Sequence, residues 1–137
     1  MLARDKPLNE ERKGLAIETA TKTAWGLIAL AHVMPALVLF KPSLTERLYG
    51  LAPTGDIGLL IVHRGALFLA IVAACLIAMV DASTRRAISG IVAISLVGFL
   101  FVYVRGAMPE GGLRTIALAD LIALLPLIFV TDQAWNR

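Results

Sequence analysis

Four polar side chains interrupt long apolar runs of this sequence, and they are the residues that could do chemistry there. They are His32, His63, Arg64 and Asp120. Ionisable groups are costly inside a bilayer and normally face the interior of a helix bundle or a pocket. Arginine can bind an anionic or carbonyl group, a carboxyl can exchange a proton, and histidine can shuttle protons or hydrogen-bond a ligand. We therefore expect function to lie at these four residues, although the sequence assigns none of them a catalytic role.

Each of these residues also has a purely structural interpretation. Arg64 and Asp120 could form an ion pair that only fixes how two helices align, with Arg64 extending toward the membrane surface. The histidines could make hydrogen bonds between helices. His32 and His63 could instead be the two axial ligands of a haem. That arrangement requires the two helices to stand further apart than close packing allows, which disfavours haem as a cofactor.

Other kinds of site are not supported by the sequence. It has no GxSxG, no glycine-rich phosphate loop followed by Lys-Ser/Thr and no HExxH motif. The single cysteine, Cys75, cannot form an internal disulfide or a CxxC motif, so we predict a packing residue and no metal site. Basic residues near the N-terminus alternate with acidic ones, which disfavours nucleic-acid binding.

The elements that position these residues follow from hydropathy. The chain is 58% hydrophobic with a mean hydropathy of +0.80, above the usual range of a soluble domain. The apolar residues fall into four runs, each near the length of about 20 residues that a membrane-spanning helix needs. These runs cover residues 21–40, 57–80, 87–104 and 113–130. We expect an all-α, integral membrane four-helix bundle in a single domain, 1–137, with a cytoplasmic N-terminal segment, 1–20.

Charge outside the runs predicts the orientation. Eight basic residues precede the first run, separate the second from the third, or end the chain: Arg4, Lys6, Arg12, Lys13, Lys22, Arg85, Arg86 and Arg137. The opposite side has four: Lys41, Arg47, Arg105 and Arg114. Because cytoplasmic loops are enriched in lysine and arginine, both termini are predicted to be cytoplasmic. Trp25 and Trp135 would mark one membrane interface and Tyr49 and Tyr103 the other.

This orientation brings the four polar residues to one depth. His32 lies eight residues before the outer end of the first run, and His63, Arg64 and Asp120 lie six or seven residues after the outer ends of theirs. At 1.5 Å per residue, all four lie roughly 9–12 Å below the outer surface. They should therefore form one polar layer of the bundle.

Short motifs predict the connections. Ser43-x-x-Glu46 resembles a capping box and Gly50 a C-terminal stop, so a short interfacial helix is expected at 44–49 in the first outer loop. Asp56 can cap the second span, and Asn9 can cap a short cytoplasmic helix at 9–20 that runs into the first span. The inner loop 81–86 is short enough to make the second and third spans a tight antiparallel hairpin.

One face of the second span is also predicted from its sequence. Four alanines recur at every fourth position and should pack against another helix: Ala66, Ala70, Ala74 and Ala78. His63 is placed on the same face, which would point it into the bundle. Pro35 and Pro126 should kink the first and fourth spans.

The sequence is also similar to a known group. At Arg47-Leu48-Tyr49-Gly50, and at His63-Arg64-Gly65-Ala66-Leu67-Phe68-Leu69, it resembles the DoxX-like small bacterial membrane proteins, in an uncharacterised branch. Pro35 and Ala119-Asp120 extend the similarity over most of the length. The resemblance implies a compact four-helix bundle in the bacterial inner membrane. Some DoxX relatives are associated with quinone-linked sulfur oxidation, but this chain lacks a cysteine pair for sulfur chemistry.

Two hypotheses of function follow. In the first, the polar layer lines an intramembrane pocket near the outer face that binds a lipophilic or quinone-like ligand. In the second, the chain is a non-catalytic accessory subunit whose polar layer locks helices together or docks a larger membrane complex. A unit of this size has little interior volume, which favours the second hypothesis or a homo-oligomer. Whether the protein is an enzyme is not decided by the sequence.

Overall fold

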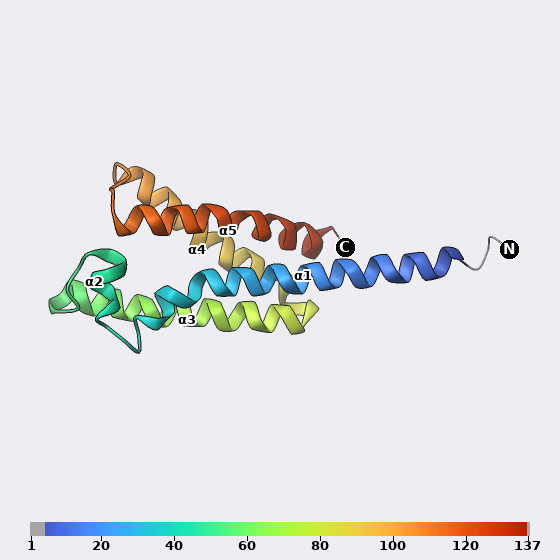
Figure 1. Cartoon of the computed structure of the whole chain (residues 1–137), viewed down its shortest axis with the longest axis horizontal. Coiled ribbons are helices and arrows are strands. Elements are labelled where there is room, and N and C mark those ends of the chain that lie inside the picture. The colour runs from blue at the N-terminus through green and yellow to red at the C-terminus, as the bar shows by residue number, and fades with distance from the viewer. Residues whose placement is uncertain (1–4, 137) are drawn as a thin grey trace.

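The computed structural model describes residues 5–136, and the side chains from residue 8 onward. In that part of the chain the protein is entirely helical and contains no strand. The elements are α1 (Asp5–Leu37), α2 (Leu44–Tyr49), α3 (Gly55–Val80), the 3-10 turn η1 (Ala82–Thr84), α4 (Arg85–Arg105) and α5 (Gly112–Trp135) (Figure 1). The first four residues of the predicted cytoplasmic segment 1–20 lie outside the described residues. So do Arg4 and Arg137, two of the basic residues counted for the orientation.

Three of these helices are long and apolar enough to cross a membrane. They are α3, α4 together with η1, and α5. Their bounds contain the predicted runs 57–80, 87–104 and 113–130, and α5 continues five residues further than expected, to Trp135. The protein therefore has the helices of a multi-pass membrane protein.

The first run agrees with the prediction in its continuity and differs in where it ends. Residues 9–20 run into the apolar segment after them as one continuous helix, α1, as predicted, but this helix ends at Leu37 and not at residue 40. Pro35 lies inside this helix and lacks the N–H that the helical pattern requires. The chain then tightens, since the amides of Val38 and Leu39 donate to carbonyls three residues earlier, at 3.3 and 3.1 Å. Apolar residues 38–40 consequently form turns.

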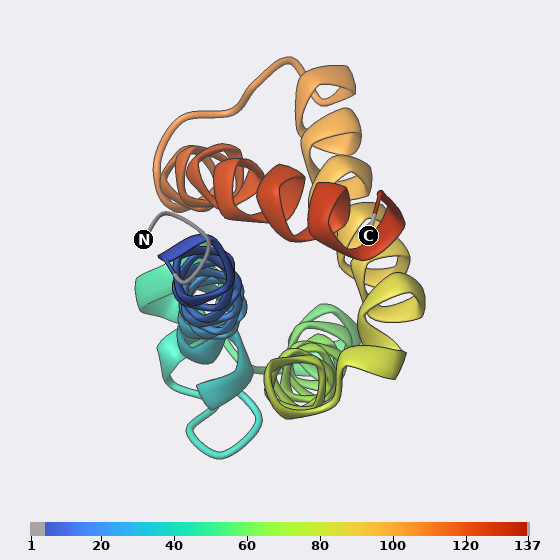
Figure 2. The same cartoon turned by 90° about the vertical axis from the view of Figure 1, so that its right-hand side faces the viewer.

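The four long helices pack as two pairs joined through α1. Helix α1 lies along α3 and also contacts α5, while α4 packs on α5 (Figures 1 and 2). Helix α4 slants away from α3 beyond the short connection at η1 and has few contacts with it. The short inner loop is thus confirmed, but the tight hairpin predicted for these two helices is wrong. The beginning of α1 projects past the other helices, at the end of the bundle where α5 finishes (Figure 1).

The outer loop confirms the predicted helix and its stop, but not the predicted caps. Helix α2 covers residues 44–49, and Gly50 ends it at φ 69° with its N–H bonded to the Glu46 carbonyl. Ser43 makes no side-chain cap, because the carbonyls of Lys41 and Pro42 already accept the first amides of α2, at 3.0 and 2.9 Å.

The other two predicted caps are also wrong. Helix α3 begins at Gly55 after Thr54, which makes no cap bond either, so Asp56 lies within the first turn. Asn9 lies inside α1 and therefore cannot begin a helix.

The buried face of α3 is not the predicted alanine face. Ala78 is buried, but Ala66 and Ala74 are half-buried and Ala70 is exposed. The residues that do pack inward recur at alternating intervals of seven and three: Gly58, Gly65, Phe68, Cys75 and Ala78. That is the spacing of helices packed lengthwise. Positions four apart rotate about 40° around the helix at each step, so an alanine every fourth residue drifts off the packed face.

Two consecutive arginines at the start of α4 connect all four long helices. The Arg85 guanidinium donates to both carboxylate oxygens of Glu18 on α1, at 2.7 and 2.9 Å, and its Nε donates to the Ala78 carbonyl of α3 at 2.9 Å. Arg86 Nε donates to the Ala134 carbonyl of α5 at 2.7 Å. Both carbonyls lie in the last turn of a helix, where no amide of the same helix is available. The arginines therefore cap α3 and α5.

The Glu18–Arg85 pair should be a measurable part of the stability. The Arg85 side chain is only 10% exposed, so Glu18→Gln leaves a largely buried guanidinium without its anion. We expect the free energy of unfolding in detergent to fall by about 1–2 kcal/mol. The matched control is Glu10→Gln, which breaks the exposed 3.3 Å pair with Lys13 and should change stability by less than about 0.5 kcal/mol. Equal effects of the two variants would contradict this role of Arg85.

The same pair should give stability a dependence on acid. Hydrogen bonds from Arg85 hold the pKa of Glu18 below its usual value of 4.5, since they favour the carboxylate. A lowered folded-state pKa contributes stability that is fully present above pH 4.5 and is lost as the pH falls through the lowered value. The thermal unfolding midpoint should be measured from about pH 6 to about pH 3, the range in which carboxyl groups titrate. It should fall with pH in the wild type and fall less in Glu18→Gln.

Candidate functional site

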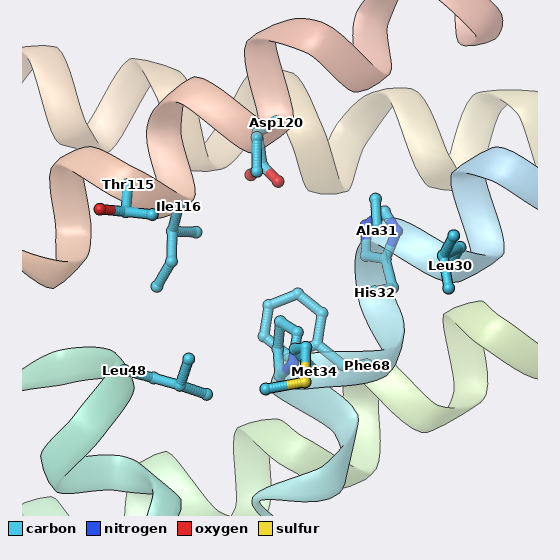
Figure 3. Close-up of a pocket in the computed structure, with 11 residues that line it drawn as sticks. Leu30, Ala31, His32, Met34, Leu48, Phe68, Thr115, Ile116 and Asp120 are labelled. Atoms are coloured by element: carbon cyan, nitrogen blue, oxygen red, sulfur yellow. The ribbon is translucent and has the colours of Figure 1, made fainter.

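A cavity of about 300 Å³ opens between α1, α2, α3 and α5, at the end of the bundle opposite the arginines (Figure 3). This volume is at the lower end of small-molecule sites. Most of its lining is aliphatic or aromatic, with a histidine, a threonine and an aspartate as the polar members. The lining residues are Leu30, Ala31, His32, Met34, Pro35, Leu48, Phe68, Thr115, Ile116, Ala119 and Asp120.

His32 is the most buried polar residue of this site. It is 1% exposed and comes from α1, where its Nδ1 lies 2.8 Å from the carbonyl oxygen of Ile28, one turn earlier. The opposite ring nitrogen, Nε2, is buried and has no hydrogen-bond partner among the described residues. The Phe68 ring of α3 lies beside it, with 5.8 Å between the ring centroids. A buried polar atom without a partner costs about 1–3 kcal/mol, so Nε2 calls for a ligand or a water molecule.

Asp120 enters the same space from α5. Its carboxyl group projects from that helix toward the cavity, on the side facing α1 and α2 (Figure 3). It makes neither a hydrogen bond nor an ion pair with any residue that the structure describes. His32 and Asp120, which the sequence predicted to share one layer, line the same cavity.

Arg64 lies next to this cavity but does not pair with Asp120 as predicted. Its guanidinium lies over two aromatic rings, 5.1 Å from the centroid of Phe68 and 5.3 Å from that of Phe99. Phe68 follows Arg64 by one turn on α3, and Phe99 faces it from α4, so both rings are placed to meet the cation. Cation–π contacts therefore take the place of the ion pair, with Phe68 between Arg64 and His32.

Tyr49 shows that both charges are nevertheless close to the end of α2. Burial raises the pKa of the Tyr49 hydroxyl, while the charge of Arg64 lowers it and that of Asp120 raises it. Arg64 and Asp120 are thus both near Tyr49, although only Asp120 lines the cavity.

His63 is not part of this site. It is exposed on the outer face of α3, so the prediction that it points into the bundle is wrong. The reason is the rotation of α3: its buried face carries Gly65 and Phe68, and His63 lies well around the helix from both. Since His32 faces inward and His63 outward, the two histidines cannot bind one haem iron.

Two residues that the sequence prediction missed complete the site. Phe68 contacts both His32 and Arg64, and Leu48 of α2 covers the cavity from the outer side. An aromatic residue one turn after an intramembrane arginine is a signal that could have identified Phe68. Nothing in the sequence indicates that α2 folds back onto α3 and α5.

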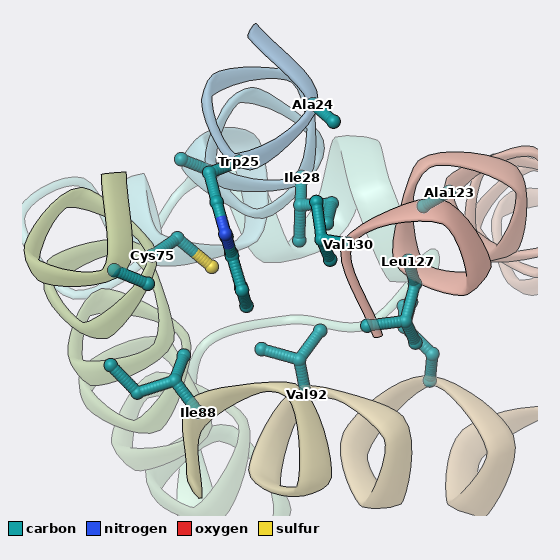
Figure 4. Close-up of a cluster of buried hydrophobic side chains, with 12 residues drawn as sticks. Ala24, Trp25, Ile28, Cys75, Ile88, Val92, Ala123, Leu127 and Val130 are labelled. Atoms are coloured by element: carbon teal, nitrogen blue, oxygen red, sulfur yellow. The ribbon is translucent and has the colours of Figure 1, made fainter. Parts of the chain in front are cut away.

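The other half of the bundle is filled. Trp25 projects from α1 into the space between α3, α4 and α5, and it is completely buried (Figure 4). The predicted role of Trp25 at a membrane interface is therefore wrong. Apolar residues of all four long helices surround it, including Ile28, Cys75, Ala78, Ile88, Val92, Leu96, Ala123, Leu127 and Val130. Cys75 is a packing residue of this core, as predicted. The hollow end is thus a local feature of the bundle.

Gly65 allows α3 to approach the turn that follows α1. A Cβ atom at this position would lie 2.8 Å from the backbone nitrogen of Leu39, closer than such atoms approach. This contact fixes the end of α1, and with it His32, against the segment of α3 that carries Arg64 and Phe68. A similar approach at Gly112, against the Leu48 carbonyl, fixes α2 on the start of α5.

Comparisons of this chain with protein-family models, with curated proteins and with solved structures found no match. The resemblance to DoxX-like proteins therefore stays a prediction, and the function is argued from the geometry of the cavity.

The close approach at Gly65 predicts an effect on stability. Gly65→Ala should lower the free energy of unfolding in detergent by about 1–3 kcal/mol, because the added methyl group forces α3 away from Leu39. Gly98→Ala is the matched control in α4, since no atom lies within 4 Å of the position its Cβ would take. There alanine should be neutral or stabilise by up to about 1 kcal/mol through helix propensity. A neutral Gly65→Ala would show that the two segments are not in contact.

Proposed function

We propose that this chain is a small four-span membrane protein whose outer half holds a binding cavity for a lipophilic ligand. The observation that carries the proposal is the buried, unpaired Nε2 of His32, a residue that lines a cavity of about 300 Å³ together with Asp120. Polar groups that only lock helices together would be expected to bond to one another. An apolar lining with a few convergent polar groups is typical of a site for a small, mostly apolar molecule. A quinone-like ligand is the version that the resemblance to DoxX-like proteins suggests.

The fourth span in this proposal is the second half of α1. Four large apolar side chains form an exposed stripe along it, at the spacing of one helical face: Leu27, Leu30, Met34 and Leu37. Its threonines are compatible with lipid because Thr19, Thr21 and Thr23 each donate to a carbonyl one turn earlier, at 2.9–3.0 Å. Packing of α1 against both α3 and α5 would carry it through the membrane with them.

The proposed orientation has both termini in the cytoplasm, in a bacterial inner membrane. The arginines that cap α3 and α5 would then lie at the cytoplasmic surface, where basic residues are enriched, and the cavity would open toward the outer surface. Helix α2 would cover that opening. A lipophilic ligand could reach the cavity from the outer leaflet without crossing the packed core.

Filling the cavity tests the proposed binding. Ile116 lines it from α5 and points into it (Figure 3), so Ile116→Trp should remove a bound lipophile. We expect native mass spectrometry of gently solubilised wild-type protein to show a stoichiometric small molecule, and Ile116→Trp to lose at least about 90% of it, because the larger side chain fills the site.

The matched control is Ile128→Trp, on the same helix, because Ile128 is 65% exposed. This variant should keep the bound molecule. A wild-type protein that is empty and co-purifies with other subunits would argue instead for the accessory role.

The orientation has its own test. A reporter that is active only outside the cytoplasm should be inactive when fused after Arg137 and active when inserted in the loop between α4 and α5. The opposite pattern would put the cavity on the cytoplasmic side.

A further inference from the structure

The hydrogen bond made by His32 defines what its other ring nitrogen can do. The carbonyl oxygen of Ile28 can only accept, so the His32 Nδ1 within 2.8 Å of it carries the proton and donates. No carboxylate among the described residues bonds to the ring, and a second ring proton would place an unpaired charge on a residue that is 1% exposed. The ring therefore takes the neutral form in which Nε2 has no proton and is a hydrogen-bond acceptor.

The rest of the cavity adds further acceptors. Pro35 has no N–H, so the carbonyl of Ala31, four residues earlier, loses its helical donor, and both residues line the cavity. The carboxyl group of Asp120 offers at least one acceptor oxygen in either protonation state. The cavity therefore has more than one group that can accept a hydrogen bond from a bound molecule.

Donors are scarce at the same place. Among the lining residues besides His32, only Thr115 has a side-chain donor independent of protonation, and its hydroxyl lies 3.5 Å from the Gly111 carbonyl. The remaining lining side chains are hydrocarbon or thioether, apart from Asp120. The Arg64 guanidinium lies beyond the Phe68 ring and is not part of the lining. The cavity therefore has acceptors in excess of donors.

We infer that the ligand of this cavity is a lipophilic alcohol or phenol, whose hydroxyl group donates to Nε2 of His32. This inference rests on the proposed function and narrows its ligand class. A molecule with carbonyl acceptors only, such as an oxidised quinone, would leave Nε2 unpaired and would place its oxygens beside those of Asp120. A hydroxyl group satisfies Nε2, and its own oxygen can still accept from a water molecule. The apolar part of the ligand packs on Met34, Phe68 and Ile116.

A matched pair of ligands tests the hydroxyl group directly. The probes are a 4-alkylphenol and its methyl ether, which share the ring and chain but differ in the O–H donor. Both partition into detergent, so binding to the cavity is taken as the difference in calorimetric titration between wild type and Ile116→Trp. The phenol should bind the wild-type cavity roughly three- to tenfold more tightly, the worth of one buried hydrogen bond.

Replacing the acceptor should remove that preference. His32→Leu keeps an apolar side chain of similar length and has no ring nitrogen, so phenol and ether should bind it with affinities within about twofold of each other. Equal binding of the two probes to wild type, or tighter binding of the ether, would overturn the inference while leaving the cavity a lipophile site. Binding of neither probe above the Ile116→Trp background would overturn the proposed function and the inference with it.

A second measurement does not depend on any ligand or on the folding of a cavity variant. The exposed His63 can be changed to glutamine, so that His32 is the one histidine left in the sequence. Nitrogen-15 NMR of this protein should then show a protonated Nδ1 and an unprotonated Nε2, the less common tautomer of a free imidazole. A protonated Nε2 would make His32 a donor to the cavity and would overturn the hydroxyl-donor assignment.

Discussion

The hydrogen bonds of Arg85 and Arg86 are the constraint on which the rest of this bundle depends. Neighbouring side chains at the start of α4 bind the ends of α3 and α5, and Arg85 also binds Glu18 of α1. In lipid, apolar surface gives little force for helix association, so hydrogen bonds and close packing determine how helices assemble. Carbonyls at helix ends need donors in any case. Arg85 and Arg86 thus donate to the free carbonyls at the ends of α3 and α5 and connect all four long helices at one end of the bundle.

The packed core and the cavity are two consequences of that arrangement. Helices held at one end pack closely there, and Trp25 fills the space between them. Away from this end α4 slants from α3, and the helices separate toward α2. Phe68 and the neighbouring Phe99 partly occupy this wider half and hold the Arg64 guanidinium between them. The remaining space is the cavity, closed from outside by α2, which Gly112 allows to lie directly on α5.

The polar groups of the cavity are arranged for binding more than for stability. A buried histidine whose Nε2 is unpaired lowers the stability of the empty protein, since a leucine there would need no partner. Arg64, by contrast, is stabilised by cation–π contacts, because aromatic rings offset part of the cost of a cation near lipid. The Phe68 ring contacts both Arg64, which has cation–π partners, and His32, whose Nε2 has none. A ligand would therefore be stabilising on the His32 side of this ring.

The sequence by itself determined that α3, α4 and α5 are long helices, because a long apolar run has few alternatives to a helix in a bilayer. It also determined α2, through Gly50. Residue counts along the helices predicted one layer for His32 and Asp120, and both line the same cavity. The partners were decided by the tertiary structure. Whether His63 faces inward, whether Arg64 meets Asp120 or Phe99, and whether Trp25 lies at an interface or in the core depend on how each helix is rotated and tilted. A rotation of one residue, about 100°, exchanges an inward for an outward side chain without changing hydropathy. Only packing between the helices fixes that rotation.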